Sequence, residues 1–159
     1  MSLVKQLIMV GCIFSACVKP PAHVKQAQEV TKEFAEKIEK ETGLFSLGSG
    51  GFYTDKKIDS LYVDFEAKGN FSQNEARELL MNTMVSFVEF VNQNLEIRPF
   101  LSTYPITEKQ ISASIGFVDE KRVPVQGLSQ IHLYTNTLYY SSFQIDTKQY
   151  VTYQKDPLF

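Results

Sequence analysis

The chain has 159 residues, of which 43% are hydrophobic and 21% are charged. This size and composition indicate one globular domain and exclude a disordered or collagen-like chain. The 16 lysines and arginines are balanced by 18 acidic residues, so there is no basic excess to bind a phosphate backbone, and we expect no nucleic-acid partner. Two histidines and two cysteines leave little material for a metal cage. We therefore expect neither a metal nor a cofactor.

The N-terminus has the pattern of a targeting segment. Lys5 precedes an apolar run over residues 7–14, and two small residues then lead to Cys17. The run is shorter than the roughly 20 apolar residues that span a bilayer. It is typical of the hydrophobic part of a secretory signal, in which small residues precede the cleavage site.

The ending Phe14-Ser15-Ala16-Cys17 resembles the lipobox of bacterial lipoproteins. In that family the cysteine is acylated and the signal is cut immediately before it. The resemblance implies a signal peptide over residues 1–16, a lipid-anchored tether over 17–22 and a single domain over 23–159. It also implies a membrane-anchored protein of the cell envelope, on the periplasmic or surface side. Phe14 stands where the family usually has an aliphatic residue. Cys12 is a rival site, and an ordinary signal peptide is the alternative.

Two helices are predicted from apolar residues that recur every three or four positions. The first runs from His23 to Thr42, and Gly43 follows where a helix-ending glycine is common. The second begins at Ser72, which forms a predicted capping box with Glu75. Its predicted apolar face consists of Ala76, Leu80, Met84, Phe87, Val88, Val91 and Leu95. This broad face predicts a helix that lies across a sheet.

Alternating apolar and polar residues predict strands in the remainder of the chain. The predicted strands are Phe45–Tyr53, Ile58–Ala67, Ile111–Phe117, Leu128–Thr135, Leu138–Ile145 and Tyr150–Tyr153. Short strands separated by tight turns favour antiparallel pairing. The expected fold class is therefore α+β, an antiparallel sheet with two amphipathic helices packed on one face, in the order α-β-β-α-β-β-β-β.

Few residues stand in a catalytic pattern. The cluster Gly48-Ser49-Gly50-Gly51 lacks the lysine and helix start of a phosphate-binding loop and is interpreted as a bend in a strand. Asp64 and Glu66 share one face of a strand, near Asp59. Any two carboxylates placed two residues apart on a strand lie within the distance of a catalytic pair, so the spacing alone does not indicate catalysis. His132 is a single strand histidine with no nucleophile motif beside it. We therefore name no catalytic residue.

A cluster of tyrosines near the C-terminus is the clearest candidate for a binding surface. Tyrosine combines a flat apolar ring with a polar tip, which suits contact with sugars, peptides or a partner protein. Tyr140, Tyr134 and Tyr153 are the residues proposed for this surface. Tyr139 and Tyr140 must point to opposite faces of their strand, and the parity of Phe143 and Ile145 predicts Tyr139 in the core and Tyr140 outside. Sheet packing is the alternative role of the cluster.

These patterns do not define an activity. They favour a lipid-anchored binding or structural module of the cell envelope without catalytic activity, held at the membrane by its anchor. Its partner would be an envelope protein or the cell wall. The alternatives are an envelope hydrolase acting on cell-wall sugar or peptide, and a small-ligand carrier with a hollow between sheet and helices.

Overall fold

The computed structural model describes residues 19–158. Within this range the chain forms two long helices, two short 3-10 turns and six strands. The elements are α1 (Ala22–Thr42), β1 (Phe45–Thr54), β2 (Lys57–Lys68), α2 (Gln73–Gln93), η1 (Arg98–Phe100), η2 (Glu108–Gln110), β3 (Ile111–Val118), β4 (Gln130–Tyr134), β5 (Thr137–Gln144) and β6 (Gln149–Pro157). The predicted lipobox lies outside the described residues. Among those described, no helix has the length and apolar character needed to cross a membrane.

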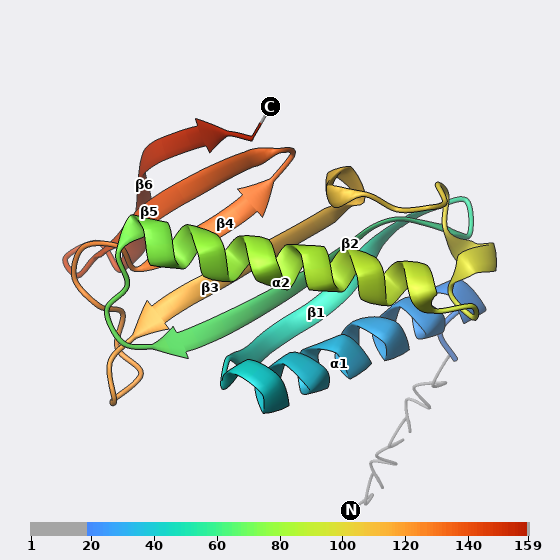
Figure 1. Cartoon of the computed structure of the whole chain (residues 1–159), viewed down its shortest axis with the longest axis horizontal. Helices are drawn as coiled ribbons and strands as arrows, with labels where there is room; N and C mark the ends of the chain where they lie inside the picture. The colour runs from blue at the N-terminus through green and yellow to red at the C-terminus, as the bar shows by residue number, and fades with distance from the viewer. Residues whose placement is uncertain (1–18, 159) are drawn as a thin grey trace, which may run out of the picture.

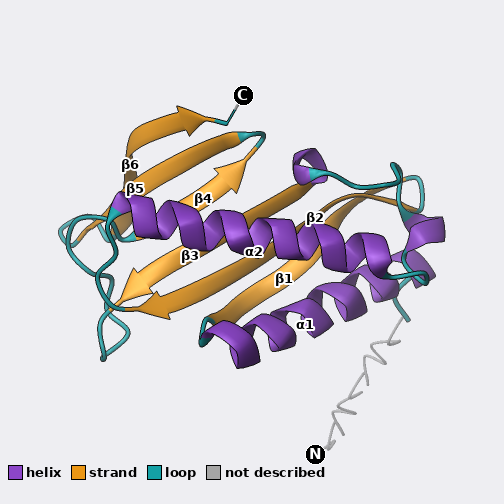
Figure 2. Ribbon diagram, in the orientation of Figure 1, coloured by secondary structure: helices purple, strands orange, loops and turns teal. Residues whose placement is uncertain are grey.

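The elements form two layers, a six-stranded sheet and a pair of helices on one of its faces (Figures 1 and 2). Helix α1 packs on β1 and β2, and α2 packs on β3 and β4. This arrangement confirms the α+β class and the predicted order of elements. It also leaves the opposite face of the sheet without a helix among the described residues.

The strands lie in the sheet in chain order, β1-β2-β3-β4-β5-β6. Neighbouring strands are antiparallel except for β2 and β3, which are parallel and start with Leu61 opposite Ile111. The sheet is therefore mixed, where the sequence pattern favoured purely antiparallel pairing. The reason is the position of α2 in the chain. The helix runs back along the sheet from the end of β2, so β3 starts at the same end of the sheet as β2 and runs in the same direction.

Both helices have the ends that the sequence predicts. Gly43 closes α1 in the left-handed conformation at φ 74°. At the start of α2 the Glu75 amide donates to Ser72 Oγ over 3.3 Å, and the Ser72 amide donates to Glu75 Oε2 over 2.9 Å. These two bonds complete the capping box, and the bonds from Ser72 lower the pKa of the Glu75 carboxyl.

The core lies between the helices and the sheet. Phe34 on α1 stacks on Phe87 of α2 with ring centroids 4.5 Å apart, which joins the two helices above the strands. Most of the predicted α2 face is buried, but Val88 is only partly buried and Leu95 is exposed. Leu95 falls outside the face because the helix ends at Gln93, two residues earlier.

The predicted orientation of β5 is wrong. Tyr140 is 1% exposed and packs in the core, whereas Tyr139 lies on the opposite face. Tyr140 pairs with Ile131 of β4, which is itself fully buried on the helix side. The prediction assumed that Phe143 and Ile145 face the core. Phe143 is instead half-buried and packs on the Tyr150 ring, and Ile145 is 69% exposed.

Candidate functional site

The face of the sheet opposite the helices, here called the open face, carries a polar and aromatic surface. The buried residues of β2, β3 and β4 alternate with half-exposed ones, which must point to this face. The half-exposed residues of these three strands include Ser60, Tyr62, Asp64, Glu66, Ser112, Ser114, Gln130 and His132. Serine hydroxyls therefore line the middle of the open face, between aromatic rings.

Strand register brings six residues into one line across the sheet. Each is the direct partner of the next on the neighbouring strand: Gly48, Asp64, Ser114, His132, Tyr139 and Lys155. We call this line the transverse row. These residues span more than a hundred positions of sequence, so the sheet alone assembles them.

Neighbours within the transverse row contact one another. Ser114 Oγ donates a hydrogen bond of 2.6 Å to Asp64 Oδ1. The His132 and Tyr139 rings stack with centroids 4.7 Å apart and planes 3° from parallel. Lys155 Nζ lies 5.3 Å from the centroid of the Tyr139 ring, within the range of a cation–π contact. The row thus contains two contacting groups, Asp64 with Ser114 and His132 with Tyr139 and Lys155.

Burial sets the charge of His132. Loss of solvent lowers the pKa of the imidazole, and the Asp64 carboxylate opposes this shift with a weaker upward effect. The imidazole is therefore neutral near pH 7 and offers one donor and one acceptor nitrogen. Its Nδ1 is buried and has no hydrogen-bond partner among the described residues.

The order of groups in the transverse row differs from that of a catalytic triad. In a triad the serine donates to histidine, and the carboxylate holds the far side of the imidazole. Here Ser114 donates to the carboxylate of Asp64 and lies between Asp64 and His132. The carboxylate thereby holds the hydroxyl hydrogen that a nucleophile would pass to a histidine base. The arrangement favours hydrogen bonding to a ligand over nucleophilic attack.

Two neighbouring hollows open on this face beside the transverse row. One, of about 340 Å³, is lined by Asp64, Ser114, Gln130 and His132, among others. The other, of about 180 Å³, is lined by Phe52, Ser60, Lys109 and Gln110, among others. Both hollows are lined by Ser112 and Tyr134, so they adjoin at these two residues.

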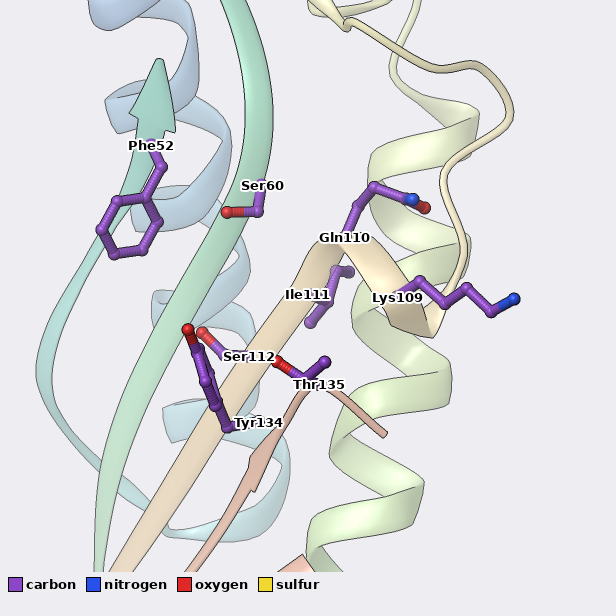
Figure 3. A pocket seen from close by; sticks show the side chains of 8 residues that line it. All are labelled: Phe52, Ser60, Lys109, Gln110, Ile111, Ser112, Tyr134 and Thr135. Carbon is purple, nitrogen blue, oxygen red and sulfur yellow. The ribbon is translucent and has the colours of Figure 1, made fainter. Parts of the chain in front are cut away.

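The smaller hollow has an aromatic ring on each side. Figure 3 shows Phe52 from β1 and Tyr134 from the end of β4, with Ser60 and Ser112 on the strands between them. Phe52 is 61% exposed and Tyr134 is 61% exposed, so both rings are free to cover a ligand. Phe52 also lies 5.9 Å from the Tyr62 ring, measured between centroids, which supports its position on the open face.

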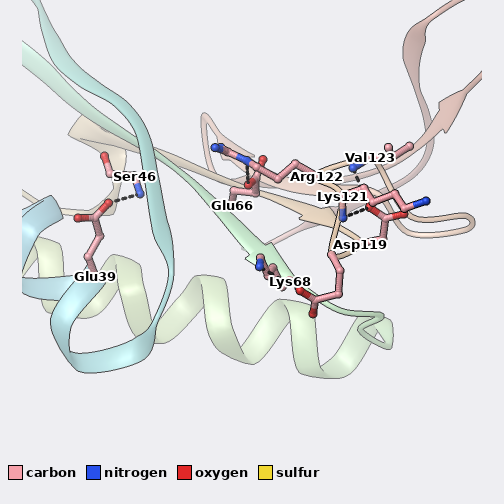
Figure 4. Close-up of polar contacts among 9 residues, drawn as sticks. Glu39, Ser46, Glu66, Lys68, Asp119, Lys121, Arg122 and Val123 are labelled. Atoms are coloured by element: carbon pink, nitrogen blue, oxygen red, sulfur yellow. Dashed lines mark hydrogen bonds and ion pairs between the residues drawn. The ribbon is translucent and has the colours of Figure 1, made fainter.

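The other carboxylate of the predicted set has a structural partner. Arg122 Nε lies 2.8 Å from Glu66 Oε1 (Figure 4). The guanidinium also lies over the ring of Phe45. Asp119 closes the turn that carries this arginine, because its carboxylate accepts from the amides of Lys121 and Val123. Glu66 thus anchors a loop, whereas Asp64 faces the larger hollow.

The structure does not bring the three proposed tyrosines together. Tyr134 lies on the open face, whereas Tyr140 is buried under α2. Tyr153 is 49% exposed and accepts a hydrogen bond of 3.4 Å from Gln73 Nε2 at the start of α2, on the other side of the sheet. The candidate surface therefore keeps Tyr134 and loses Tyr140, and Tyr153 is remote from it.

Sequence reasoning missed the residues that accompany Tyr134 on this surface: Phe52, Ser60, Ser112 and Ser114. The alternation of serine with aliphatic residues along β3 was the available signal, because it marks a face built from small hydroxyls. That signal does not say which neighbouring strands flank β3.

Among residues 19–158, no group of three or more histidine, cysteine or acidic side chains is placed to hold a metal ion. Comparison of the chain with protein-family models, with curated proteins and with solved structures finds no match. A function for the open face must therefore be argued from its own chemistry.

Proposed function

We propose that this protein is a non-catalytic binding module of the cell envelope, anchored through a lipid on Cys17, that holds its ligand on the open face. The observation that carries the binding role is the transverse row with its two adjoining hollows. It gathers hydrogen-bonding groups and aromatic rings on a sheet face that no described helix covers. Sites of this composition bind ligands through ring contacts and a few oriented polar groups.

Two features favour this role over the alternatives raised by the sequence. The hydrogen bond from Ser114 to Asp64 holds the hydroxyl away from the role of a nucleophile, which disfavours a hydrolase built on this row. The layer between helices and sheet is occupied by large, fully buried side chains such as Phe34, Phe65 and Phe87. A carrier that encloses its ligand would need that space.

The envelope location rests on the lipobox resemblance alone. A membrane anchor would concentrate the module at a surface and favour weak, repeated contacts with an extended partner. Pro20 and Pro21, directly before α1, favour an extended and stiff entry to the domain over a helical one. The anchor and the open face thus contribute separately, one to location and one to recognition.

A sedimentation experiment tests the binding role. The full chain, purified in mild detergent, is mixed with detergent-extracted cell walls from the bacterium that produces the protein. We expect the wild-type chain to sediment with the walls and Tyr134→Ala to remain in solution. Tyr153→Ala is the matched control, because it removes an exposed tyrosine far from the open face, and it should sediment like the wild type. Equal sedimentation of all three chains, or none by the wild type, would contradict the proposal.

A further inference from the structure

The two adjoining hollows differ from an ordinary polar surface in the placement of their rings. Phe52 and Tyr134 border the smaller hollow, and His132, whose ring stacks on Tyr139, lines the larger one. Between these rings the floor carries the short hydroxyls of Ser60, Ser112 and Ser114. The ligand therefore meets apolar ring surfaces and hydroxyl groups in alternation.

A pyranose sugar has the matching chemistry. Its axial C–H groups form an apolar face that packs on an aromatic ring, while its equatorial hydroxyls point outward and hydrogen-bond to side chains at its edge. Asp64 and Gln130 supply acceptors in the larger hollow. The hydroxyls of Ser60 and Thr135 border the smaller one, whereas the Lys109 and Gln110 side chains point away from Phe52 and Tyr134 (Figure 3). The neutral imidazole of His132 adds a donor or an acceptor, depending on which ring nitrogen carries the proton.

The charge and shape of the hollows narrow the class of saccharide. The lining carries one carboxylate, Asp64, and the Lys109 ammonium points away from Phe52 and Tyr134 (Figure 3), so the hollows offer no positive charge that would attract a polyanion. The hollows adjoin at Ser112 and Tyr134, so one elongated ligand can occupy both. A compact ligand would fill only one of them.

From this arrangement we infer that the open face binds a neutral, extended saccharide chain, with one sugar held between Phe52 and Tyr134 and further units running toward Asp64 and His132. This inference rests on the proposed function and specifies its ligand. The two exposed rings supply the stacking contacts. The serine hydroxyls and Asp64 orient the sugar edges.

Calorimetric titration of the full chain in mild detergent tests the inference, with soluble N-acetylglucosamine oligomers of increasing length as the probe. We expect binding that strengthens with length until both hollows are occupied. Phe52→Ala and Tyr134→Ala should each weaken binding by about tenfold, the effect of losing one aromatic contact. A polygalacturonate oligomer, which is anionic, should bind more weakly than the neutral probe.

The chain offers a matched control for each variant. Phe45 lies on the same strand as Phe52 and is 52% exposed, yet it packs against Arg122 outside both hollows. Phe45→Ala controls for Phe52→Ala, and Tyr153→Ala controls for Tyr134→Ala; both controls should bind like the wild type. Equal losses in controls and test variants would overturn the assignment of the rings.

The result separates this inference from the proposed function. If the wild type sediments with cell walls in a Tyr134-dependent manner but neutral oligomers neither bind nor compete, the saccharide inference is wrong and the binding module stands. If neither walls nor oligomers bind, both fail. Competition of the oligomers with wall binding would support both.

Discussion

His132 and Tyr139 stack face to face across β4 and β5, with ring planes 3° from parallel. The stack removes solvent from one side of the imidazole, and loss of solvent lowers the pKa of His132 by more than the Asp64 carboxylate raises it. The same contact holds Tyr139 beneath Lys155, so a single aromatic pair links the centre of the sheet to its β6 edge.

The lowered pKa of His132 predicts a pH-dependent stability. The unfolded chain binds a proton at His132 more readily than the folded chain, so the free energy of unfolding should fall as pH is lowered. The loss begins near the unfolded pKa of about 6.5 and is complete below the folded value. Urea unfolding between about pH 8 and pH 5 should show this slope, and His132→Gln should reduce it. Parallel profiles for both chains would show that His132 does not contribute.

The carboxylate of Asp64 raises the pKa of His132 against the effect of burial. Asp64→Asn keeps the shape of the side chain and removes its charge, so the His132 pKa should fall further. An NMR titration of the imidazole resonances measures the shift directly. Glu66→Gln is the control, because Glu66 lies on the same face of β2 but pairs with Arg122, and it should leave the His132 titration unchanged.

Burial of Tyr140 makes it a core residue, so its truncation should be costly. Tyr140→Ala should lower the free energy of unfolding by about 3–5 kcal/mol, as truncations of large buried aromatic residues do. Tyr134→Ala removes an exposed ring and should change the free energy of unfolding by less than about 0.5 kcal/mol. Urea denaturation of the two variants compares these effects. Similar midpoints for both would mean that the orientation of β5 is misassigned.

The capping box of α2 should contribute measurably to stability. Ser72→Ala removes the oxygen that accepts from the Glu75 amide and should cost about 1 kcal/mol of unfolding free energy. Ser72→Thr keeps a hydroxyl at the cap and should recover most of the loss. Thermal unfolding followed by circular dichroism measures both. If alanine and threonine melt alike, the hydroxyl does not stabilise the helix.

Lipid attachment is predicted at Cys17, which lies outside the described residues. Metabolic labelling with a fatty-acid analogue should mark the wild-type chain and not Cys17→Ser, since the thiol is the acylated group. Cys12→Ser is the control, because it removes the rival cysteine, and it should retain the label. Loss of label in Cys12→Ser alone would move the anchor to Cys12. Equal labelling of all three chains would contradict lipid attachment at Cys17.

Much of the local structure follows from the sequence because its causes are local. The Ser72–Glu75 capping box, the Gly43 helix end and the alternation along β2 and β3 depend on residues a few positions apart, and all three are present in the structure. The α+β class follows from the order of these elements. The predicted lipid anchor also derives from a short local motif.

The open face was decided by tertiary structure alone. Alternation shows that Asp64, Ser114 and His132 each lie on the exposed face of their own strand. It does not show that β3 lies parallel to β2 or that these three residues fall in one row. Tyr140 shows the same limit, because the parity of β5 depends on its pairing with Ile131 and not on the residues near its end. Strand pairing is set by contacts between distant segments, such as the packing of α2 on β3 and β4, and the candidate site exists only once those contacts have formed.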